Sequence, residues 1–430
     1  MLSVFAQAFR TPDLRKKLLF MMAMIGIYRI GSYVPTPGVD YPAVQECVRQ
    51  VQGDSLYALI NLFSGGALLQ LSIFALGIMP YITASIILQL LVVVIPRLET
   101  LKKEGQAGQA KITQYTRYLT VGLAVLQSTG IVSLARSGNL IRGCNLDIIP
   151  NESLWSIVSM IMVMSAGTGV IMWLGELITD RGIGNGMSLL IFTSIIAGFP
   201  GQLTVIRASR GDWIMFVVLG VGLLVVAFVV LMEQAQRRVP VQYAKRMVGR
   251  RMYGGTSTYI PLKVNQAGVI PVIFASSMMY LPVLFTTITG STGPVAQWVE
   301  THLVRGSGAY YALLFFGLIV FFTFFYVAIT FNPDEVADNM KKYGGFIPGI
   351  RAGRPTAEYL DYVLTRLTSV GAIYLGAIAV LPVVAFASLG QGQNFIFGGT
   401  SILIMVGVGL DTVKQIESQL QQRNYEGFLR

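Results

Sequence analysis

Charged residues, histidine and cysteine are all scarce in this sequence. Only 12% of its 430 residues are Asp, Glu, Lys or Arg, whereas soluble globular domains carry about 25%. There is one histidine, His302, and we find no nucleophile–base pair, metal-ligand spacing or phosphate-binding loop. These shortages argue against a large soluble core and against catalysis within this chain. We therefore expect a protein that is not an enzyme, with no catalytic residue, cofactor or metal.

Long apolar runs are what the sequence has in abundance. Hydrophobic residues make up 53% of the chain, and a helix needs about 20 of them to cross a bilayer. The run that begins at Leu18 is not followed by a small-residue cleavage site, so we interpret it as a retained span. We predict an all-α polytopic membrane protein with ten transmembrane helices. The predicted spans are residues 18–35, 72–95, 117–134, 154–178, 185–203, 213–232, 267–289, 310–331, 368–386 and 396–412.

The lysines and arginines predict the orientation of these spans. Loops on the side that holds both termini contain 25 of the 32 basic residues, and the opposite loops contain 6. Cytoplasmic loops of membrane proteins are enriched in Lys and Arg. We therefore predict that both termini are cytoplasmic and that the positive net charge forms a cytoplasmic face, not a nucleic-acid footprint. Arg29 lies inside the first span, where it either snorkels or caps a loop.

A six-residue pattern occurs once in each half of the chain. Residues 77–82 read GIMPYI in the second span, and residues 268–273 read GVIPVI in the seventh. Both lie in the second helix of a five-helix half, and an odd number of spans gives the two halves opposite orientations. We predict one integral membrane domain built as an inverted repeat, with an N-terminal half at 1–212 and a C-terminal half at 213–430.

Residues 56–70 are apolar but too short to cross a membrane, and Ser64, Gly65 and Gly66 interrupt them. Non-helical backbone at membrane depth is tolerated only inside protein or beside a water-filled cavity. The pattern leaves two interpretations open. The segment is either an amphipathic turn at the surface or a re-entrant plug in a vestibule.

The two cysteines, Cys47 and Cys144, both fall in predicted external loops. They are either two independent thiols or a disulfide that joins the loops, since the external compartment is oxidising. The sequence does not choose between the two.

A basic cytoplasmic loop at 233–266 carries seven positive charges and one acidic residue. Such a loop attracts anionic lipid, the phosphates of ribosomal RNA or an acidic protein surface. The alternative is a solvated loop that only fixes the orientation. A second cytoplasmic loop is predicted at 332–367.

Several blocks of this sequence resemble SecY, the central subunit of the bacterial Sec translocon. The similarity covers essentially the whole chain in order, and the sequence YAKRMVGRRMYGG at residues 243–255 is typical of actinobacteria. The matching blocks are residues 61–68 (NLFSGGAL) continuing through 74–82 to Gln89, residues 173–186 (WLGELITDRGIGNG), residues 236–251 with 261–265, residues 344–351 (GGFIPGIR) and residues 398–404 (GGTSILI).

The resemblance implies a protein-conducting channel in the bacterial inner membrane, shaped as an hourglass of ten helices. It implies that residues 56–70 are the plug, and the plug positions singled out are Ile60, Asn61, Leu62, Phe63, Ser64, Gly65 and Gly66. At the waist it implies a ring of apolar side chains at Ile78, Ile82, Met187, Ile191, Ile273 and Ile404. The family favours isoleucine in this ring, so Met187 is a conservative departure whose flexible thioether reshapes the seal.

An apolar ring suits such a channel for two physical reasons. A narrow apolar constriction dewets and so blocks ions and water at rest. It also offers no hydrogen-bond partner to a passing chain, so unfolded polypeptides of diverse sequence slide through it.

The resemblance also implies a lateral gate, where the second and third spans face the seventh and eighth. Prolines in the gate helices are expected to interrupt their hydrogen-bond ladders, and polar side chains are expected to hold the seam closed by about 0.6 kcal/mol each. The candidate gate residues are Pro80, Ser85, Gln89, Pro271, Ser276 and Ser277.

The implied partners are SecE, SecG, the SecA ATPase, the ribosome, unfolded secretory and membrane proteins, and the lipid bilayer. The residues expected to contact SecA or the ribosome are Arg237, Arg238, Lys245, Arg246, Arg250, Arg251 and Arg351. Two other classes of protein remain as alternatives: an inverted-repeat secondary transporter, which requires a polar midplane site, and a membrane scaffold without a pore.

Overall fold

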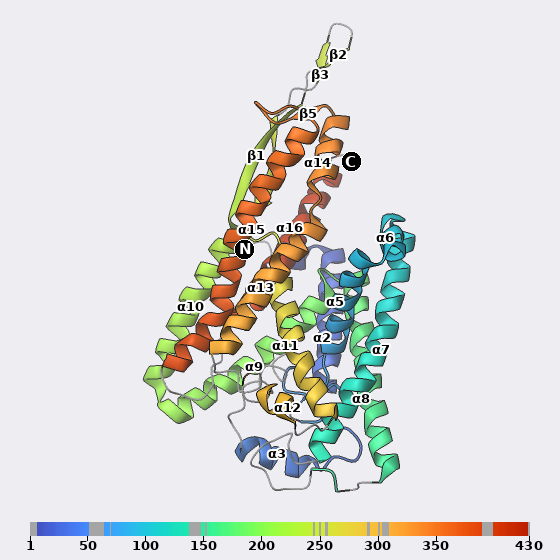
Figure 1. Cartoon of the computed structure of the whole chain (residues 1–430), viewed down its shortest axis with the longest axis vertical. Helices are drawn as coiled ribbons and strands as arrows, with labels where there is room; N and C mark the ends of the chain where they lie inside the picture. Colours follow the sequence, from blue (N-terminus) through green and yellow to red (C-terminus); the bar gives the residue numbers. More distant parts are fainter. Residues whose placement is uncertain are drawn as a thin grey trace.

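A computed structural model of the chain is mostly helical (Figure 1). The residues that it describes are 7–50, 64–68, 70–136, 148–150, 153–243, 246–248, 251–253, 257–289, 293–299, 302, 309–388 and 399–428.

A helix overlaps each of the ten predicted spans, which confirms the helical membrane fold. By length and apolar composition alone, five of the described helices could cross a membrane, or six if the bent pair α5 and α6 forms one span. The helices at the predicted spans are α2 (Pro12–Gly31), α5 (Met79–Val94), α7 (Gln106–Arg136), α8 (Leu154–Arg181), α9 (Gly186–Arg210), α10 (Asp212–Gln234), α11 (Ile270–Thr289), α13 (Ala309–Thr330), α15 (Arg354–Ser388) and α16 (Gly399–Phe428).

Shorter elements lie at the two ends of the molecule. Helix α6 (Pro96–Lys103), helix α14 (Pro333–Lys342) and the strands lie towards one end, whereas α3 (Tyr41–Gln50) and α12 (Pro294–Val299) lie towards the other (Figure 1). The first group belongs to the loops that the basic residues assign to the cytoplasm, and the second group belongs to the opposite loops.

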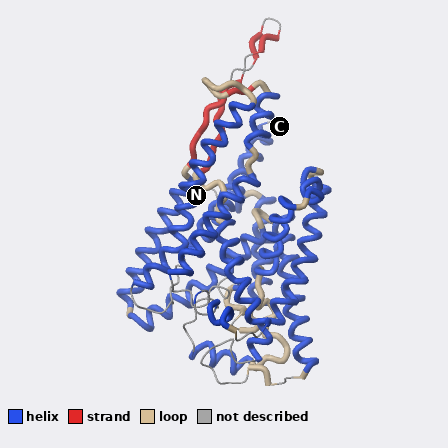
Figure 2. The backbone as a smooth tube through the Cα atoms, in the orientation of Figure 1, coloured by secondary structure: helices blue, strands red, loops and turns tan. Residues whose placement is uncertain are grey.

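The basic loop at 233–266 contains a β-hairpin, which departs from the predicted all-α fold. Strands β1 (Gln236–Tyr243) and β4 (Ser257–Lys263) pair antiparallel, and β5 (Gly345–Phe346) joins the other edge of β1. Strands β2 (Arg246–Val248) and β3 (Arg251–Tyr253) form a second hairpin further along the same loop. All strands of the described chain lie at one end of the helical body (Figure 2).

The hairpin is ordered because one of its faces is buried. Val239, Val241 and Leu262 alternate with exposed residues and pack on Met340 of α14 and Leu360 of α15. Alternation of apolar and polar residues is the pattern of a half-buried strand. The loop therefore has a small core of its own, which it forms with α14 and α15.

The two GxxPxI motifs adopt the same local structure. Gly77 and Gly268 both have positive φ, at 55° and 63°, a conformation that glycine adopts without steric cost. Helix α5 then begins at Met79 and α11 at Ile270, two residues after each glycine.

The packing around these motifs also recurs in the two halves. A Cβ atom on Gly167 of α8 would lie 2.1 Å from the Ile73 carbonyl oxygen, and one on Gly371 of α15 would lie 2.5 Å from the Val264 carbonyl oxygen. Ile73 and Val264 each stand four residues before the motif glycine. In each half, therefore, the fourth long helix contacts the backbone that leads into the second.

The fifth long helix of each half begins with a glycine in a comparable position. A Cβ on Gly186, the first residue of α9, would lie 1.9 Å from the Gly175 carbonyl oxygen of α8. A Cβ on Gly399, the first residue of α16, would lie 1.7 Å from the Ile378 carbonyl oxygen of α15. These recurring backbone contacts show that the similarity between the two halves extends well beyond the six-residue motif.

Candidate functional site

The six candidate ring residues all belong to the large apolar cluster that forms the core of the described chain, or pack against it. Ile78, Ile82, Met187, Ile191 and Ile404 are buried members of it, and Ile273 is partly buried and packs against it. They come from the start of α5 and from α9, α11 and α16, which are widely separated in the sequence. Ile404 is fully buried and Ile78 is 2% exposed. All six candidates are therefore core residues or pack against the core, and their arrangement as a ring stays a prediction.

Local capping positions Met187 within this cluster. The Asn185 side chain accepts hydrogen bonds from the backbone N–H groups of Met187 and Ser188, at 3.1 and 3.4 Å, and so caps the start of α9. The Met187 sulfur lies where a side chain at Gly175 would be, 2.4 Å from the Cβ position of that glycine. The long thioether therefore packs against the backbone of α8 at Gly175, where no side chain is in the way.

The expectation that Pro80 and Pro271 interrupt the gate helices is wrong. Pro80 and Pro271 are each the second residue of their helix, α5 and α11. At that position the missing N–H would have had no partner within the helix, so proline breaks no hydrogen bond there. Residues 73–78, which the sequence assigned to the second span, form turns instead and are mostly buried. Buried non-helical backbone of this kind is compatible with membrane depth.

The polar candidates of the gate make their hydrogen bonds within their own helices. Ser276 and Ser277 donate to the carbonyl oxygens of Val272 and Ile273, at 2.8 and 3.0 Å. Gln89 donates to Ser85, one turn earlier in α5, at 3.5 Å. Helix α11 nevertheless packs against both α5 and α7, so the predicted seam exists as a helix contact. The hydrogen bonds of these residues do not cross it, which corrects the expected polar fastening.

Of the candidate plug, Ile60, Asn61, Leu62 and Phe63 lie outside the described residues, whereas Ser64, Gly65 and Gly66 lie within them. The Arg29 guanidinium donates from Nη1 to the Gly65 carbonyl oxygen at 3.0 Å and from Nη2 to the Tyr33 hydroxyl at 2.9 Å. Of the two roles considered for Arg29, it takes the second and caps a loop. Sequence reasoning did not identify Tyr28, whose buried hydroxyl lies 2.6 Å from Ser194 Oγ on α9.

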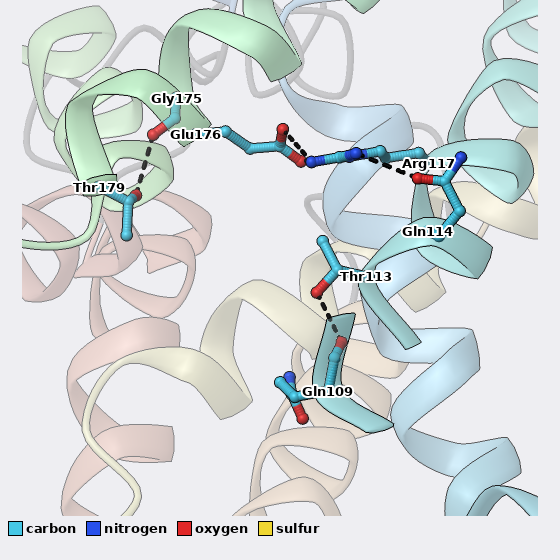
Figure 3. A network of polar contacts seen from close by, with 7 residues as sticks. All are labelled: Gln109, Thr113, Gln114, Arg117, Gly175, Glu176 and Thr179. Atoms are coloured by element: carbon cyan, nitrogen blue, oxygen red, sulfur yellow. Dashed lines mark hydrogen bonds and ion pairs between the residues drawn. The ribbon is translucent and has the colours of Figure 1, made fainter. Parts of the chain in front are cut away.

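A polar network ties α7 to α8 near the predicted cytoplasmic side (Figure 3). Arg117 binds both carboxylate oxygens of Glu176, with Nε–Oε1 at 2.9 Å and Nη2–Oε2 at 2.7 Å, and its Nη1 donates to Gln114. Thr179 Oγ1 donates to the Gly175 carbonyl oxygen at 2.9 Å. It also accepts from the Gly186 N–H at 2.9 Å. The sequence did not suggest this pairing because its partners stand 59 residues apart.

The basic candidates sit on the β structure and beside it. Arg237 and Arg238 are exposed on β1, and Arg351 is exposed before α15. Arg246 and Arg251 belong to the β2–β3 hairpin, and Lys245 and Arg250 lie outside the described residues.

The two cysteines differ in what the structure describes. Cys47 is fully buried in α3 and is disulfide-bonded. Cys144, the only other cysteine of the sequence, lies outside the described residues.

Taken together, the long apolar helices and their shared apolar core define a polytopic helical membrane protein. The family model for SecY matches residues 72–413, and the chain belongs to the SecY family. The protein translocase subunit SecY of Streptomyces galbus is 67% identical over 437 residues and covers 100% of both chains. That of Mycobacterium tuberculosis is 60% identical over 442 residues, again with 100% of both chains covered.

Solved structures with this fold are distant in sequence. A protein conducting channel matches 94% of this chain and 91% of its own, with a TM-score of 0.62 and 18% identity. A second structure comes from work on SecY whose plug domain stabilises the closed state of the translocation channel. It has a TM-score of 0.61 and 18% identity, with 94% of this chain and 91% of that chain covered. Sec61 in the canine ribosome–channel complex has a TM-score of 0.59 and 17% identity, with 94% and 91% covered. At these identities the likeness concerns the fold.

Proposed function

We propose that this chain is the channel subunit of a protein translocase, which passes unfolded polypeptides across a membrane and releases transmembrane segments sideways into lipid. Membership of the SecY family supports this function. The single observation that carries it is that six apolar side chains from four separate segments, Ile78, Ile82, Met187, Ile191, Ile273 and Ile404, all lie in the apolar cluster of the core or against it. We propose that these side chains form the ring at the waist of the pore.

The apolar side chains of this cluster suit a seal that blocks ions but does not bind the polypeptide that passes through it. Aliphatic and thioether side chains dewet a narrow passage, so that ions do not cross it at rest. They present no fixed donor or acceptor, so they form no specific hydrogen bond that would hold a passing polypeptide in place. A secondary transporter needs polar groups at this depth, whereas all six candidate ring side chains are apolar.

Lateral release fits the packing of the gate helices. Helix α11 contacts α5 and α7 across the seam, and Phe274 of α11 packs edge-to-face on Phe322 of α13, with ring centroids 5.8 Å apart. Ser276, Ser277 and Gln89 donate hydrogen bonds to residues of their own helices. The seam can therefore part without leaving these side chains unsatisfied, and an apolar segment of a substrate can replace the lost contacts.

We further propose a bacterial inner membrane location with both termini in the cytoplasm. The strongly basic loops share one end of the molecule (Figure 1). Towards the other end, Trp155 and Trp213 are 85% and 79% exposed near the first residues of α8 and α10. Exposed tryptophans are typical of the membrane–water interface. Under this assignment the hairpin arginines and Arg351 face the compartment in which SecA and the ribosome work.

SecE and SecG complete the set of proposed partners. Helix α10 is apolar, with only 11% of its most hydrophobic stretch buried within the chain. Such a surface requires lipid or another membrane subunit. We also propose that Cys144 is the disulfide partner of Cys47, which peptide mapping without reduction would detect.

The function is tested by crosslinking a stalled secretory chain to the apolar cluster. A photo-crosslinking residue placed at Ile82 or Ile404 should capture the stalled chain, because both line the proposed ring. The matched control is the same residue at Leu224, which is 72% exposed on α10 and faces away from the cluster. Capture at Leu224 but not at Ile82 or Ile404 would place the route elsewhere and overturn the proposal.

A further inference from the structure

We propose that Tyr28, Arg29 and Ser194 form a polar latch that holds Ser64–Leu68 in place, and that this latch sets the ion conductance of the resting channel. The inference rests on the proposed function, because a resting conductance has meaning only in a channel. It concerns residues outside the apolar ring, which the ring mechanism does not use.

The first part of the latch is the Arg29 guanidinium. Arg29 lies in α2 within a predicted span, where an arginine without partners is costly. It is half-buried, lies over the Tyr33 ring with 5.2 Å from Cζ to the centroid, and donates to the Gly65 carbonyl oxygen at 3.0 Å. A hydrogen bond from a charged donor is roughly twice as strong as a neutral one. The charge thus binds the backbone of the very segment that the family resemblance assigns to the plug.

The second part is the space in which Gly65 fits. A Cβ on Gly65 would lie 2.9 Å from Arg29 Nη1 and 3.2 Å from the Cα of Ser194. Gly65 also has a φ of +66°, which disfavours any residue with a side chain. The backbone at Gly65 is therefore wedged between α2 and α9, close enough for the arginine to bind its carbonyl oxygen.

The third part is the contact between Tyr28 and Ser194. Ser194 Oγ donates its proton to the Leu190 carbonyl oxygen at 3.0 Å, so the Tyr28 hydroxyl is the donor in the 2.6 Å contact with Ser194. Tyr28 is 1% exposed, stacks on Phe74 at 6.0 Å between centroids and also approaches the Ser64 carbonyl oxygen at 3.5 Å. This neutral bond joins α2 directly to α9.

The latch is coupled to the apolar ring through α9. Ser194 and the ring residue Ile191 stand three positions apart in this helix and so lie on the same face. A displacement of α9 that widens the ring would pull Ser194 away from Tyr28 and loosen the wedge around Gly65. Beyond the latch, backbone hydrogen bonds from Thr36 N to Leu71 O at 3.0 Å and from Ile73 N to Val34 O at 2.9 Å provide a second attachment of the segment. The latch is thus the attachment that ring opening acts on.

The test measures ion flux through the translocase in proteoliposomes without substrate. Arg29→Met keeps the stem but removes the donors, and we expect about a tenfold rise in resting flux from loss of one charged hydrogen bond. Arg29→Lys should restore part of the seal. The matched control is Arg15→Met, which removes an exposed arginine from the same helix and should leave the flux unchanged.

Two milder variants test the neutral arm in case Arg29→Met folds poorly. Tyr28→Phe and Ser194→Ala should each raise the resting flux about fivefold, and the double variant should add little, because both remove the same bond. Hydrogen exchange should quicken at the amides of Ser64–Leu68 in Arg29→Met but not along α2. A general loss of protection, or unchanged flux in Arg29→Met and Tyr28→Phe while secretory chains still cross, would overturn the latch. Failure of the unmodified channel to crosslink a stalled chain would instead count against the proposed function.

Discussion

The two halves of this chain build the same turn but anchor it with different chemistry. In both halves, a glycine with positive φ precedes a helix whose second residue is proline. A second glycine, on the fourth long helix of each half, lies against the backbone carbonyl of the residue four positions before the first glycine. In the N-terminal half, the turn is held by backbone pairing of residues 34–36 with 71–73 and by the stack of Tyr28 on Phe74.

The C-terminal half uses a buried polar anchor in the corresponding place. The Asn265 side chain donates to the Glu233 carboxylate at 2.5 Å and to the Gly268 carbonyl oxygen at 3.1 Å. Asn265 and Glu233 are 3% and 8% exposed. Close glycine contacts fix the geometry that the halves share, whereas the anchoring side chains are free to differ. The symmetry of the two halves is therefore a property of their backbone packing.

The largest effects should come from the shared glycine contacts. Gly167→Ala places a Cβ 2.1 Å from a backbone oxygen that no side-chain rotation can relieve. We expect it to lower the free energy of unfolding by about 3 kcal/mol, as overpacking a tight contact does. Gly371→Ala meets its carbonyl at 2.5 Å and should cost somewhat less. Thermal unfolding of the detergent-solubilised complex measures both.

Gly169→Ala is the matched control for these variants. It lies on the same helix as Gly167 and a Cβ there meets nothing within 4 Å, so the substitution should be neutral or slightly stabilising through helix propensity. If Gly167→Ala and Gly169→Ala behave alike, the contact with Ile73 is not a constraint and the parallel between the halves loses its physical basis.

A somewhat smaller effect should separate the halves at the polar anchor. Asn265→Leu leaves the Glu233 carboxylate buried without its amide donor, and we expect a loss of about 2 kcal/mol in the free energy of unfolding. Glu233→Gln keeps an acceptor for Asn265 and should be milder. The double variant Glu233→Leu with Asn265→Leu should be more stable than Asn265→Leu alone, because it removes both polar partners. A double variant as unstable as the sum of the singles would mean that the two side chains act independently.

Sequence patterns predicted the spans well because apolar runs of bilayer length have few other uses. They placed the start of α5 too early, since residues 73–78 are as apolar as any helix and only the positive φ of Gly77 reveals the turn. By resemblance they also predicted six ring residues, all of which lie in the apolar core or pack against it. The same patterns could not find Arg29–Gly65 or Glu233–Asn265, because a hydrogen bond between distant segments leaves no periodic signal.

The hydrogen-bond partners of the gate serines and of Gln89 were predicted wrongly for a related reason. A serine in an apolar helix satisfies itself by donating to the carbonyl one turn earlier, and sequence alone does not distinguish this bond from one across a helix seam. Candidate residues were therefore placed on the correct helices, while the partner of each polar group had to come from the structure.

The smallest effect should come from the ion pair that joins α7 to α8 in the N-terminal half. Arg117 and Glu176 form a bidentate pair, but their side chains remain 42% and 21% exposed, so solvent screens it. A double-mutant cycle with Arg117→Met and Glu176→Gln should give a coupling energy of about 1 kcal/mol that shrinks as salt is added. The pair Lys103–Glu99, exposed by 73% and 51%, is the control and should show no measurable coupling. Equal coupling in the two pairs would contradict the view that geometry and partial burial give Arg117–Glu176 its strength.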